Sequence, residues 1–269
     1  MEVEKLSAPM GAAVTGLDVK AVDQDTFKEL DRLFCQHQVL VFPKQELTPN
    51  EQMNFASHWG SLVRHPYAGH KKFPELIELK NQGKSKDVNQ HWHTDMSYAK
   101  HPAFATMLYA VEVPTLHGMP LGSTGFANAA AAYDALPQSM KDTITSLKGV
   151  FDFRGRKRSS PVSAEDIAAY PPVEHPIVRT HPRTGRKSLY IVRDDTTDIV
   201  GKDVSESRAL IEALADHVIR PEFIYQHIWQ QGDVVVWDNC TVQHRAVQDY
   251  DLPQLSLIHI SEPTRRYAI

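Results

Sequence analysis

The feature that most constrains the fold is a series of short, β-rich apolar runs, most of them in the second half of the chain. Residues 103–113 (AFATMLYAVEV) form one such run, which ends at Pro114. Residues 223–239 (FIYQHIWQQGDVVVWDN) predict a strand, a QQGD turn and a second strand, and residues 175–192 resemble two strands around a PRTG turn. The helical segments lie between these runs without a regular βαβα alternation. The pattern favours a mainly β, mostly antiparallel core with flanking helices.

The helical segments carry recognisable start and stop signals. Residues 26–34 have helical apolar spacing and are followed by the strand-like VLVF. In residues 47–60, Thr48 is a candidate N-cap, Pro49 suits the first helical position and Gly60 suits the position past the end. The remaining predicted helices are residues 128–136, 139–147 and 206–219.

Composition narrows the class of protein. The chain has 269 residues and is 42% hydrophobic, enough for one large domain or two small ones. A net charge of −4 and a pI near 6.4 argue against a nucleic-acid partner. Two cysteines, no signal-peptide pattern and no apolar run near 20 residues predict a reduced, cytoplasmic protein without a membrane partner. A small-molecule partner is expected, and the sequence leaves open whether the chain forms a homo-oligomer.

The sequence HWHTDMSYAK (91–100) places an imidazole and a carboxylate two residues apart. On a strand, the side chains of His93 and Asp95 would share one face while Thr94 points away. His244, just after an apolar strand, is a candidate for a third ligand. Two histidines and one carboxylate on one face of an octahedron are the arrangement of non-haem Fe(II) oxygenases. Taken alone, an HxD triplet also fits an ordinary polar turn.

Several further segments, in order along the chain, resemble the taurine and 2,4-dichlorophenoxyacetate dioxygenase family. They are HQVLVFPKQELTPNEQMNFASHWGSL, the string from Asn89 to Tyr98, GSTGFANAAAAYDALP, HPIVRTHPRTGRKSLYI and RPEFIYQHIWQQGDVVVWDN. The resemblance covers nearly the whole chain. It implies an Fe(II)- and 2-oxoglutarate-dependent enzyme on a double-stranded β-helix, or jelly-roll, core.

The resemblance also implies roles for individual residues. His93, Asp95 and His244 would bind iron, and no catalytic residue is expected beyond these ligands. Thr124 lies where the family has a threonine that contacts a carboxylate of 2-oxoglutarate. A carboxylate at Asp95 favours hydroxylation, because relatives that halogenate carry a small residue there.

Three positions match residues that surround the substrate in the family. His65 and Asn89 match positions that hold the substrate's anionic group in the taurine branch, and Phe153 matches an aromatic residue of the substrate pocket. Asp195 departs from the pattern, because the taurine branch has an aromatic residue there. This carboxylate argues against taurine itself unless it lies exposed on a loop.

The carboxy-terminal segment departs from the pattern more strongly. The family expects two arginines in a segment like LPQRRxMHR, and this chain has LPQLSLIHI, with Ser256 and Ile260 at those positions. Residues 255–269 also lack the character of the final strand that the fold needs. They resemble the tails of translated sequences that carry a sequencing-adaptor or frame-shift artefact. We therefore expect one dioxygenase domain over residues 1–254, followed by an atypical tail.

The leading hypothesis is a dioxygenase that uses Fe(II), 2-oxoglutarate and O₂ to hydroxylate a small anionic substrate. The substrate would be a sulfonate or carboxylate, such as taurine or an aryloxyacetate, and succinate and CO₂ would be released. One alternative is a zinc hydrolase, because two histidines and a carboxylate with an open position also describe a catalytic zinc site. Another is a jelly-roll binding protein without turnover, because the arginine for 2-oxoglutarate is missing.

Overall fold

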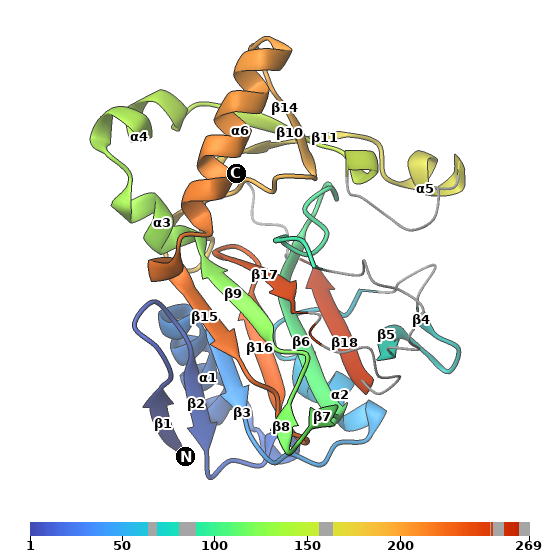
Figure 1. The fold of residues 1–269 in the computed structure, drawn as a ribbon. Coiled ribbons are helices and arrows are strands. Elements are labelled where there is room, and N and C mark those ends of the chain that lie inside the picture. The colour runs from blue at the N-terminus through green and yellow to red at the C-terminus, as the bar shows by residue number, and fades with distance from the viewer. Residues whose placement is uncertain (64–68, 81–89, 156–163, 248, 250–255, 264–269) are drawn as a thin grey trace.

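The structure is a computed structural model that describes residues 1–63, 69–80, 90–155, 164–247, 249 and 256–263. Strands form its centre and a small number of helices flank them, as the sequence predicts (Figure 1). Among the described strands every pairing is antiparallel except that of β2 with β3.

Two sheets build the core. The larger sheet has the order β1 (Glu2–Lys5), β2 (Ala12–Thr15), β3 (Val39–Phe42), β16 (Val234–Asp238), β6 (Ala103–Glu112), β18 (Ser256–Pro263), β5 (Phe73–Lys80), β4 (Gly69–His70). The smaller sheet has the order β15 (Ile224–His227), β9 (Thr124–Asn128), β17 (Val242–Ala246). One buried cluster joins them, because residues of β3, β6 and β16 pack against Phe126, Tyr225 and Val242.

Strands β3 and β16 read as continuous apolar runs because both of their faces are buried. Alternate residues of a strand point to opposite faces. In β16, Val235 and Trp237 pack toward the smaller sheet, whereas Val234 and Val236 belong to the cluster on the other face. That second cluster includes residues of α1 (Gln24–His37) and α2 (Pro49–Ala56).

The strand–turn–strand pattern of residues 223–239 spans both sheets. β15 pairs with β9 in the smaller sheet, and β16 pairs with β3 and β6 in the larger one. The intervening turn carries Gly232 at φ +86°, a conformation that suits glycine. This segment is therefore a link between the two layers of the core, and its two strands do not pair with each other.

Most of the remaining elements lie at one end of the core, whereas the short strands β7 (Thr115–Leu116) and β8 (Met119–Pro120) lie at the opposite end (Figure 1). The other strands are β10 (Lys148–Phe151), β11 (Val173–Pro176), β14 (Thr196–Ile199), β12 (Val178–Thr180) and β13 (Lys187–Leu189). The other helices are α3 (Ala129–Ala135), α4 (Gln138–Ile144), α5 (Ala164–Ala169), α6 (Val204–Val218) and the 3₁₀ turns η1 (Val19–Ala21), η2 (Phe153–Gly155) and η3 (Pro221–Phe223). Helices α3 and α6 bury their apolar sides in a third cluster with β12, β13 and β14.

Two expectations about segment ends are wrong. The helix capped by Thr48 begins at Pro49 and ends at Ala56, four residues before Gly60, because residues 57–59 form a turn. The carboxy-terminal segment does form a strand, since the backbone of β18 pairs with β6 on one side and β5 on the other. The backbone N–H and C=O groups of this segment pair with those of both neighbouring strands, and this pairing does not depend on the missing arginines.

Candidate metal centre

His93, Asp95 and His244 come together in the structure. Each offers one ligand atom, and these atoms all lie within 4.8 Å of one another. His93 and His244 are buried, at 4% and 7% exposure. His93 Nε2 is 3.8 Å from Asp95 Oδ1, and His244 Nε2 is 3.8 Å from Asp95 Oδ2.

Backbone pairing brings the distant histidine to the HxD segment. His93 and His244 form a β-bridge in which each backbone N–H donates to the other's carbonyl, at 3.0 and 2.8 Å. His244 lies within β17 rather than after a strand, and it pairs on its other side with Phe126. The two imidazole rings lie 4.2 Å apart between centroids, and Trp237 packs 4.6 Å from the ring of His244.

The expected strand over His93 and Asp95 is only partly present. His93 is the bridging residue, but Asp95 already begins a turn. Met96 takes a left-handed φ of 53°, and the N–H of Ala99 donates to its carbonyl at 2.8 Å. The turn ends the pairing and still leaves the Asp95 carboxylate beside both imidazoles.

A hydrogen bond fixes which nitrogen of His93 can bind a metal. His93 Nδ1 lies 2.8 Å from the carbonyl oxygen of His91. A carbonyl oxygen only accepts, so Nδ1 must carry the proton in this contact. The neutral ring then presents the lone pair of Nε2, the atom that faces Asp95, as is usual for metal-binding histidines.

The spacing of the three groups fits an ion better than it fits direct contacts. A separation of 3.8 Å is too long for a hydrogen bond between imidazole and carboxylate. Two ligand atoms that each lie about 2.0–2.2 Å from one ion are about 3–4 Å apart. Two imidazole nitrogens and one carboxylate are the donor set of non-haem Fe(II) sites.

Thr124, the predicted contact of 2-oxoglutarate, lies on the sheet that carries His244. It opens β9 and pairs with Ala246, two residues from His244 along β17. Residues two apart on a strand share a face, so Thr124 lies on the same side of the sheet as His244. Its hydroxyl oxygen accepts a hydrogen bond from Trp229 Nε1 at 2.9 Å, and the side chain is buried.

Phe153 belongs to an aromatic cluster that joins the ligand segment to two other elements. In η2, its ring lies 4.7 Å from Tyr98 and 5.3 Å from Tyr170, between centroids. Tyr98 is three residues after Asp95, so this cluster contacts the segment that carries the ligand. The other two predicted substrate contacts, His65 and Asn89, lie outside the described residues.

Asp195 is fully buried, so the alternative of an exposed loop residue is wrong. Its carboxylate accepts a hydrogen bond from the hydroxyl of Ser97, which is also buried. Ser97 is two residues after Asp95. The carboxylate therefore lies against the segment that carries the ligand.

A second group with metal-binding atoms, not predicted from the sequence, lies beside the turn after β16. The ligand atoms of His181, Asp238 and Cys240 lie within 4.8 Å of one another, and all three residues are buried. His181 Nδ1 accepts from the backbone N–H groups of Arg183 and Thr184, at 3.2 and 3.1 Å. The ring proton is therefore on Nε2, 3.3 Å from Asp238 Oδ2.

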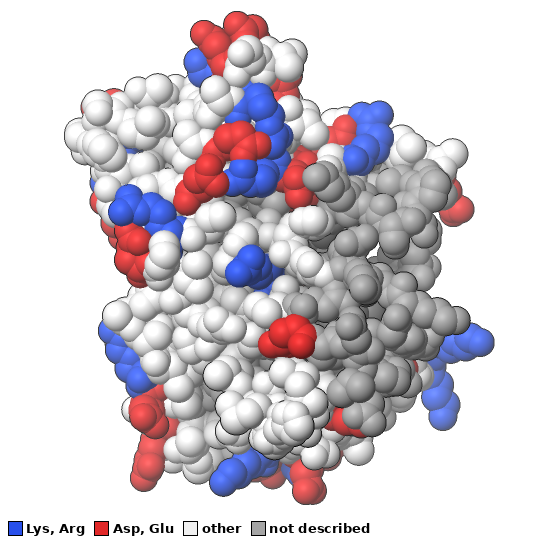
Figure 2. All heavy atoms as spheres, in the orientation of Figure 1, with Lys and Arg blue, Asp and Glu red and all other residues white. Residues whose placement is uncertain are grey.

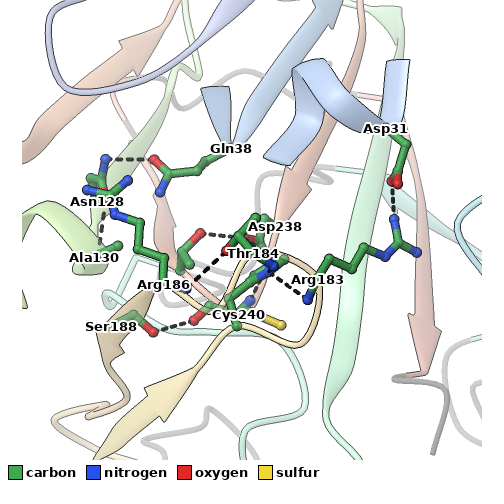
Figure 3. Close-up of polar contacts among 12 residues, drawn as sticks. Asp31, Gln38, Asn128, Ala130, Arg183, Thr184, Arg186, Ser188, Asp238 and Cys240 are labelled. Atoms are coloured by element: carbon green, nitrogen blue, oxygen red, sulfur yellow. Dashed lines mark hydrogen bonds and ion pairs between the residues drawn. The ribbon is translucent and has the colours of Figure 1, made fainter. Parts of the chain in front are cut away.

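The protonation of this second group suits a structural role better than metal binding. Burial raises the pKa of the Asp238 carboxyl, but its contacts with His181, the Thr241 hydroxyl and the Cys240 N–H together hold that pKa below its ordinary value. Burial raises the pKa of the Cys240 thiol. Figure 3 shows Ser188 meeting Cys240 and Arg183 reaching Asp31, so the surrounding loop ties the turn after β16 to α1. We interpret the group as structural.

Comparisons with known proteins decide the family. The family model described as "Taurine catabolism dioxygenase TauD, TfdA family" matches residues 2–260. The chain belongs to this family. Its members are 2-oxoglutarate-dependent (α-ketoglutarate-dependent) dioxygenases that use Fe(II) and O₂, so the predicted family, enzyme class and cofactors are confirmed.

Individual relatives cover most of the chain. The α-ketoglutarate-dependent 2,4-dichlorophenoxyacetate dioxygenase of Cupriavidus pinatubonensis is 33% identical, over 90% of this chain and 90% of that enzyme. An alkylsulfatase of Acinetobacter baylyi is 32% identical, over 93% of this chain and 81% of that protein. A taurine dioxygenase structure from Burkholderia xenovorans has a TM-score of 0.84 and 30% identity, over 98% of this chain and 89% of that chain.

Another solved structure bears on the site itself. AAD-2 in complex with Mn(II) and N-oxalylglycine has a TM-score of 0.83 and 28% identity, over 100% of this chain and 99% of that chain.

On the face drawn in Figure 2, the described basic and acidic side chains are interspersed, in keeping with the net charge of −4. Within the described part of the chain, no helix is long and apolar enough to cross a membrane.

Proposed function

We propose that this dioxygenase binds Fe(II) through His93, Asp95 and His244 and hydroxylates a small anionic organic substrate. The observation that carries the proposal is the convergence of three ligand atoms within 4.8 Å, one of them an imidazole nitrogen whose lone pair is fixed toward the carboxylate. Family membership favours iron over the zinc of a hydrolase.

The residues of the chain supply binding and orientation. Bound Fe(II) supplies the activation of O₂, with one oxygen atom entering 2-oxoglutarate as it becomes succinate and CO₂, and the other entering a substrate C–H bond. His93, Asp95 and His244 would hold the ion from one side, which leaves the opposite side for cosubstrate and O₂. The burial of His93 and His244 limits access of water to their ligand atoms.

Thr124 is the proposed contact for a carboxylate of 2-oxoglutarate. Because its oxygen accepts from Trp229 Nε1, the hydroxyl keeps its own proton to donate, as a carboxylate contact requires. The sequence supplies no arginine at 256 or 260 for the far carboxylate. Loss of a charge-assisted partner to a desolvated carboxylate costs about 2–5 kcal/mol of binding free energy. Binding of 2-oxoglutarate would then be roughly 30-fold to several-thousand-fold weaker.

The proposed substrate is a sulfonate, sulfate ester or carboxylate, with taurine and aryloxyacetates as representatives. The relatives named above act on 2,4-dichlorophenoxyacetate and on taurine, and another is named a sulfate ester dioxygenase. The aromatic cluster of Tyr98, Phe153 and Tyr170 supports an aryloxy group over taurine. The buried carboxylate of Asp195 also disfavours an anionic group in its immediate neighbourhood. His65 and Asn89 remain proposed contacts of the anion.

We further infer that the two facing sheets are the two halves of a double-stranded β-helix. Their shared apolar cluster and the link between β15 and β16 support this assignment. Residues 1–254 would then be the dioxygenase domain, and 255–269 would stand in place of a family segment with two arginines. The backbone pairing of β18 is compatible with such a replacement, since pairing needs strand character and not the arginine side chains.

Turnover with defined metals tests the proposal. Succinate would be measured with 2-oxoglutarate, O₂ and, in turn, taurine, an aryloxyacetate and an alkyl sulfate, for the natural chain and the Ser256→Arg/Ile260→Arg variant. We expect Fe(II)-dependent succinate formation, with the KM for 2-oxoglutarate at least about 30-fold lower in the double variant. His244→Ala in the double variant is the matched control and should form none.

Two results would overturn the proposal. Turnover of a substrate with Zn(II) but not Fe(II) would indicate a hydrolase. No succinate from either chain, with Fe(II) shown to be bound, would indicate a binding protein.

A further inference from the structure

The carboxylate of Asp95 is held by a residue from the centre of the larger sheet. Thr106 Oγ1 donates to Asp95 Oδ2 at 2.7 Å. Thr106 lies on β6 and is 1% exposed, so this contact is shielded from water. The backbone N–H of Asp95 lies 3.4 Å from Asn239 Oδ1 and donates to it.

Asn239 connects these contacts. Its amide Nδ2 donates to Thr106 Oγ1 at 2.7 Å, and its Oδ1 accepts from Trp237 Nε1 at 3.2 Å. An indole N–H and a backbone N–H only donate, so the side that faces Trp237 and the Asp95 N–H must be the amide oxygen. The NH₂ group therefore faces Thr106, and the amide has one orientation.

This orientation gives the hydroxyl of Thr106 a direction. The oxygen of Thr106 must accept from Asn239 Nδ2, because an NH₂ group cannot accept. Its single proton is then available for Asp95 Oδ2, which as a carboxylate oxygen accepts. Each group therefore donates to the next one, Asn239 to Thr106 and Thr106 to Asp95.

The fold brings these residues to Asp95 from two neighbouring strands. In the β16–β6 pairing, Trp237 lies opposite Thr106. Asn239 follows β16, and its backbone N–H donates to the carbonyl of Phe104 at 2.9 Å. Asp238 fixes the same turn by accepting from the N–H of Cys240 at 2.7 Å. The turn after β16 is thus anchored independently of any ion.

We propose that Thr106 and Asn239 are positioning residues, which commit Asp95 Oδ2 to a hydrogen bond and leave Oδ1 to bind the metal. Oδ1 lies 3.8 Å from His93 Nε2, and Oδ2 lies 3.8 Å from His244 Nε2, but only Oδ2 also accepts the hydrogen bond from Thr106. Binding through one oxygen leaves three coordination positions open, as a bidentate 2-oxo acid and O₂ require, whereas binding through both would occupy one of them. The proposal rests on the proposed iron site and adds the residues that set its geometry.

Binding of Fe(II) without cosubstrate tests this role. Anaerobic dialysis would give the Fe(II) dissociation constant of the natural chain and of Thr106→Val, Thr106→Ser and His93→Ala. Thr94→Val is the matched control, because it removes another buried threonine hydroxyl next to the ligands, one that donates to the Val242 carbonyl at 3.3 Å. We expect Thr106→Val to weaken binding about 10- to 100-fold, as losses around metal ligands typically do. Thr106→Ser and Thr94→Val should stay within about threefold of the natural chain.

The visible absorption of bound Co(II) gives a readout that a loss of stability alone would not move. It should change in Thr106→Val, toward the weaker bands of a higher coordination number, and stay unchanged in Thr94→Val. Thermal unfolding of the metal-free proteins shows which variants fold. If Thr106→Val does not fold, Asn239→Ala provides the same test and should also weaken Fe(II) binding.

The outcomes separate the two proposals. Unchanged Fe(II) affinity and Co(II) spectrum in a folded Thr106→Val or Asn239→Ala variant, with binding lost in His93→Ala, would overturn the positioning role alone. Binding that persists in His93→Ala would overturn the iron site itself.

Discussion

At the scale of single residues, single hydrogen bonds orient the ligand atoms of the candidate site. The carbonyl of His91 selects the tautomer of His93, and the hydroxyl of Thr106 occupies one oxygen of Asp95. Neither contact changes the identity of a ligand. Each determines which lone pair faces the shared space between the ligands.

The ligand assignment predicts sharply different effects at three adjacent positions. His93→Ala or Asp95→Ala should abolish high-affinity Fe(II) binding, because two ligands cannot replace three. Thr94→Ala should change it far less, because its hydroxyl contacts the backbone carbonyl of Val242. Anaerobic calorimetry measures the affinities, and far-ultraviolet circular dichroism checks that the fold persists. Similar Fe(II) affinity in all three variants would contradict the assignment.

At the scale of elements, the start of a helix depends on capping residues close to it in the sequence. The pairing of strands depends on residues far apart in the sequence. Asp23, Thr48 and Asp203 each cap a helix by accepting from a backbone N–H three residues ahead. The Thr48–Glu51 pair forms a complete capping box. These signals lie within a few residues of sequence, so helix starts such as that at Pro49 could be predicted.

Helix α6 allows a test of stability that leaves the metal centre untouched. Asp203 accepts from the N–H of Glu206 at 2.8 Å, and α6 packs in the cluster with α3 and β14. Asp203→Ala should lower the free energy of unfolding by about 1 kcal/mol, whereas Asp203→Ser should cost only a few tenths. Urea denaturation measures both. A change in Fe(II) affinity in either variant would show that α6 is coupled to the site.

At the scale of the whole molecule, burial of histidines links stability to pH. Burial lowers the pKa of His37, His58 and His175 below the ordinary value of 6.5. In His175, burial outweighs the contact of its Nε2 with the carbonyl of Ala99, at 3.0 Å. Below pH 6.5 the unfolded chain therefore binds more protons at these positions than the folded protein does.

The free energy of unfolding should accordingly fall as the pH drops from 7.5 through 6.5 toward the lower folded pKa values. Urea denaturation of the metal-free protein at pH 7.5, 6.5 and 5.5 measures the slope. His175→Phe should make the slope shallower, because the ring packs edge-on against Phe151 and Tyr190 and phenylalanine does not titrate. Equal slopes in the two proteins would show that His175 does not contribute.

The sequence by itself determined the local features of this protein. The apolar runs predicted the strands, the capping residues predicted the helix starts, and the pattern of segments identified the family. The residues His93, Asp95 and His244 could be singled out because an imidazole–carboxylate pair is a local pattern and the third ligand follows from the resemblance. Their convergence is a property of the folded chain.

Only the tertiary structure decided which strands became neighbours. Residues 223–239 enter two different sheets, Ser256–Pro263 pairs between β6 and β5, and Asp195 is buried against Ser97. Thr106 and Asn239, 133 positions apart, meet because β16 pairs with β6. Pairing between distant strands depends on the packing of the whole core, so no short window of sequence encodes it.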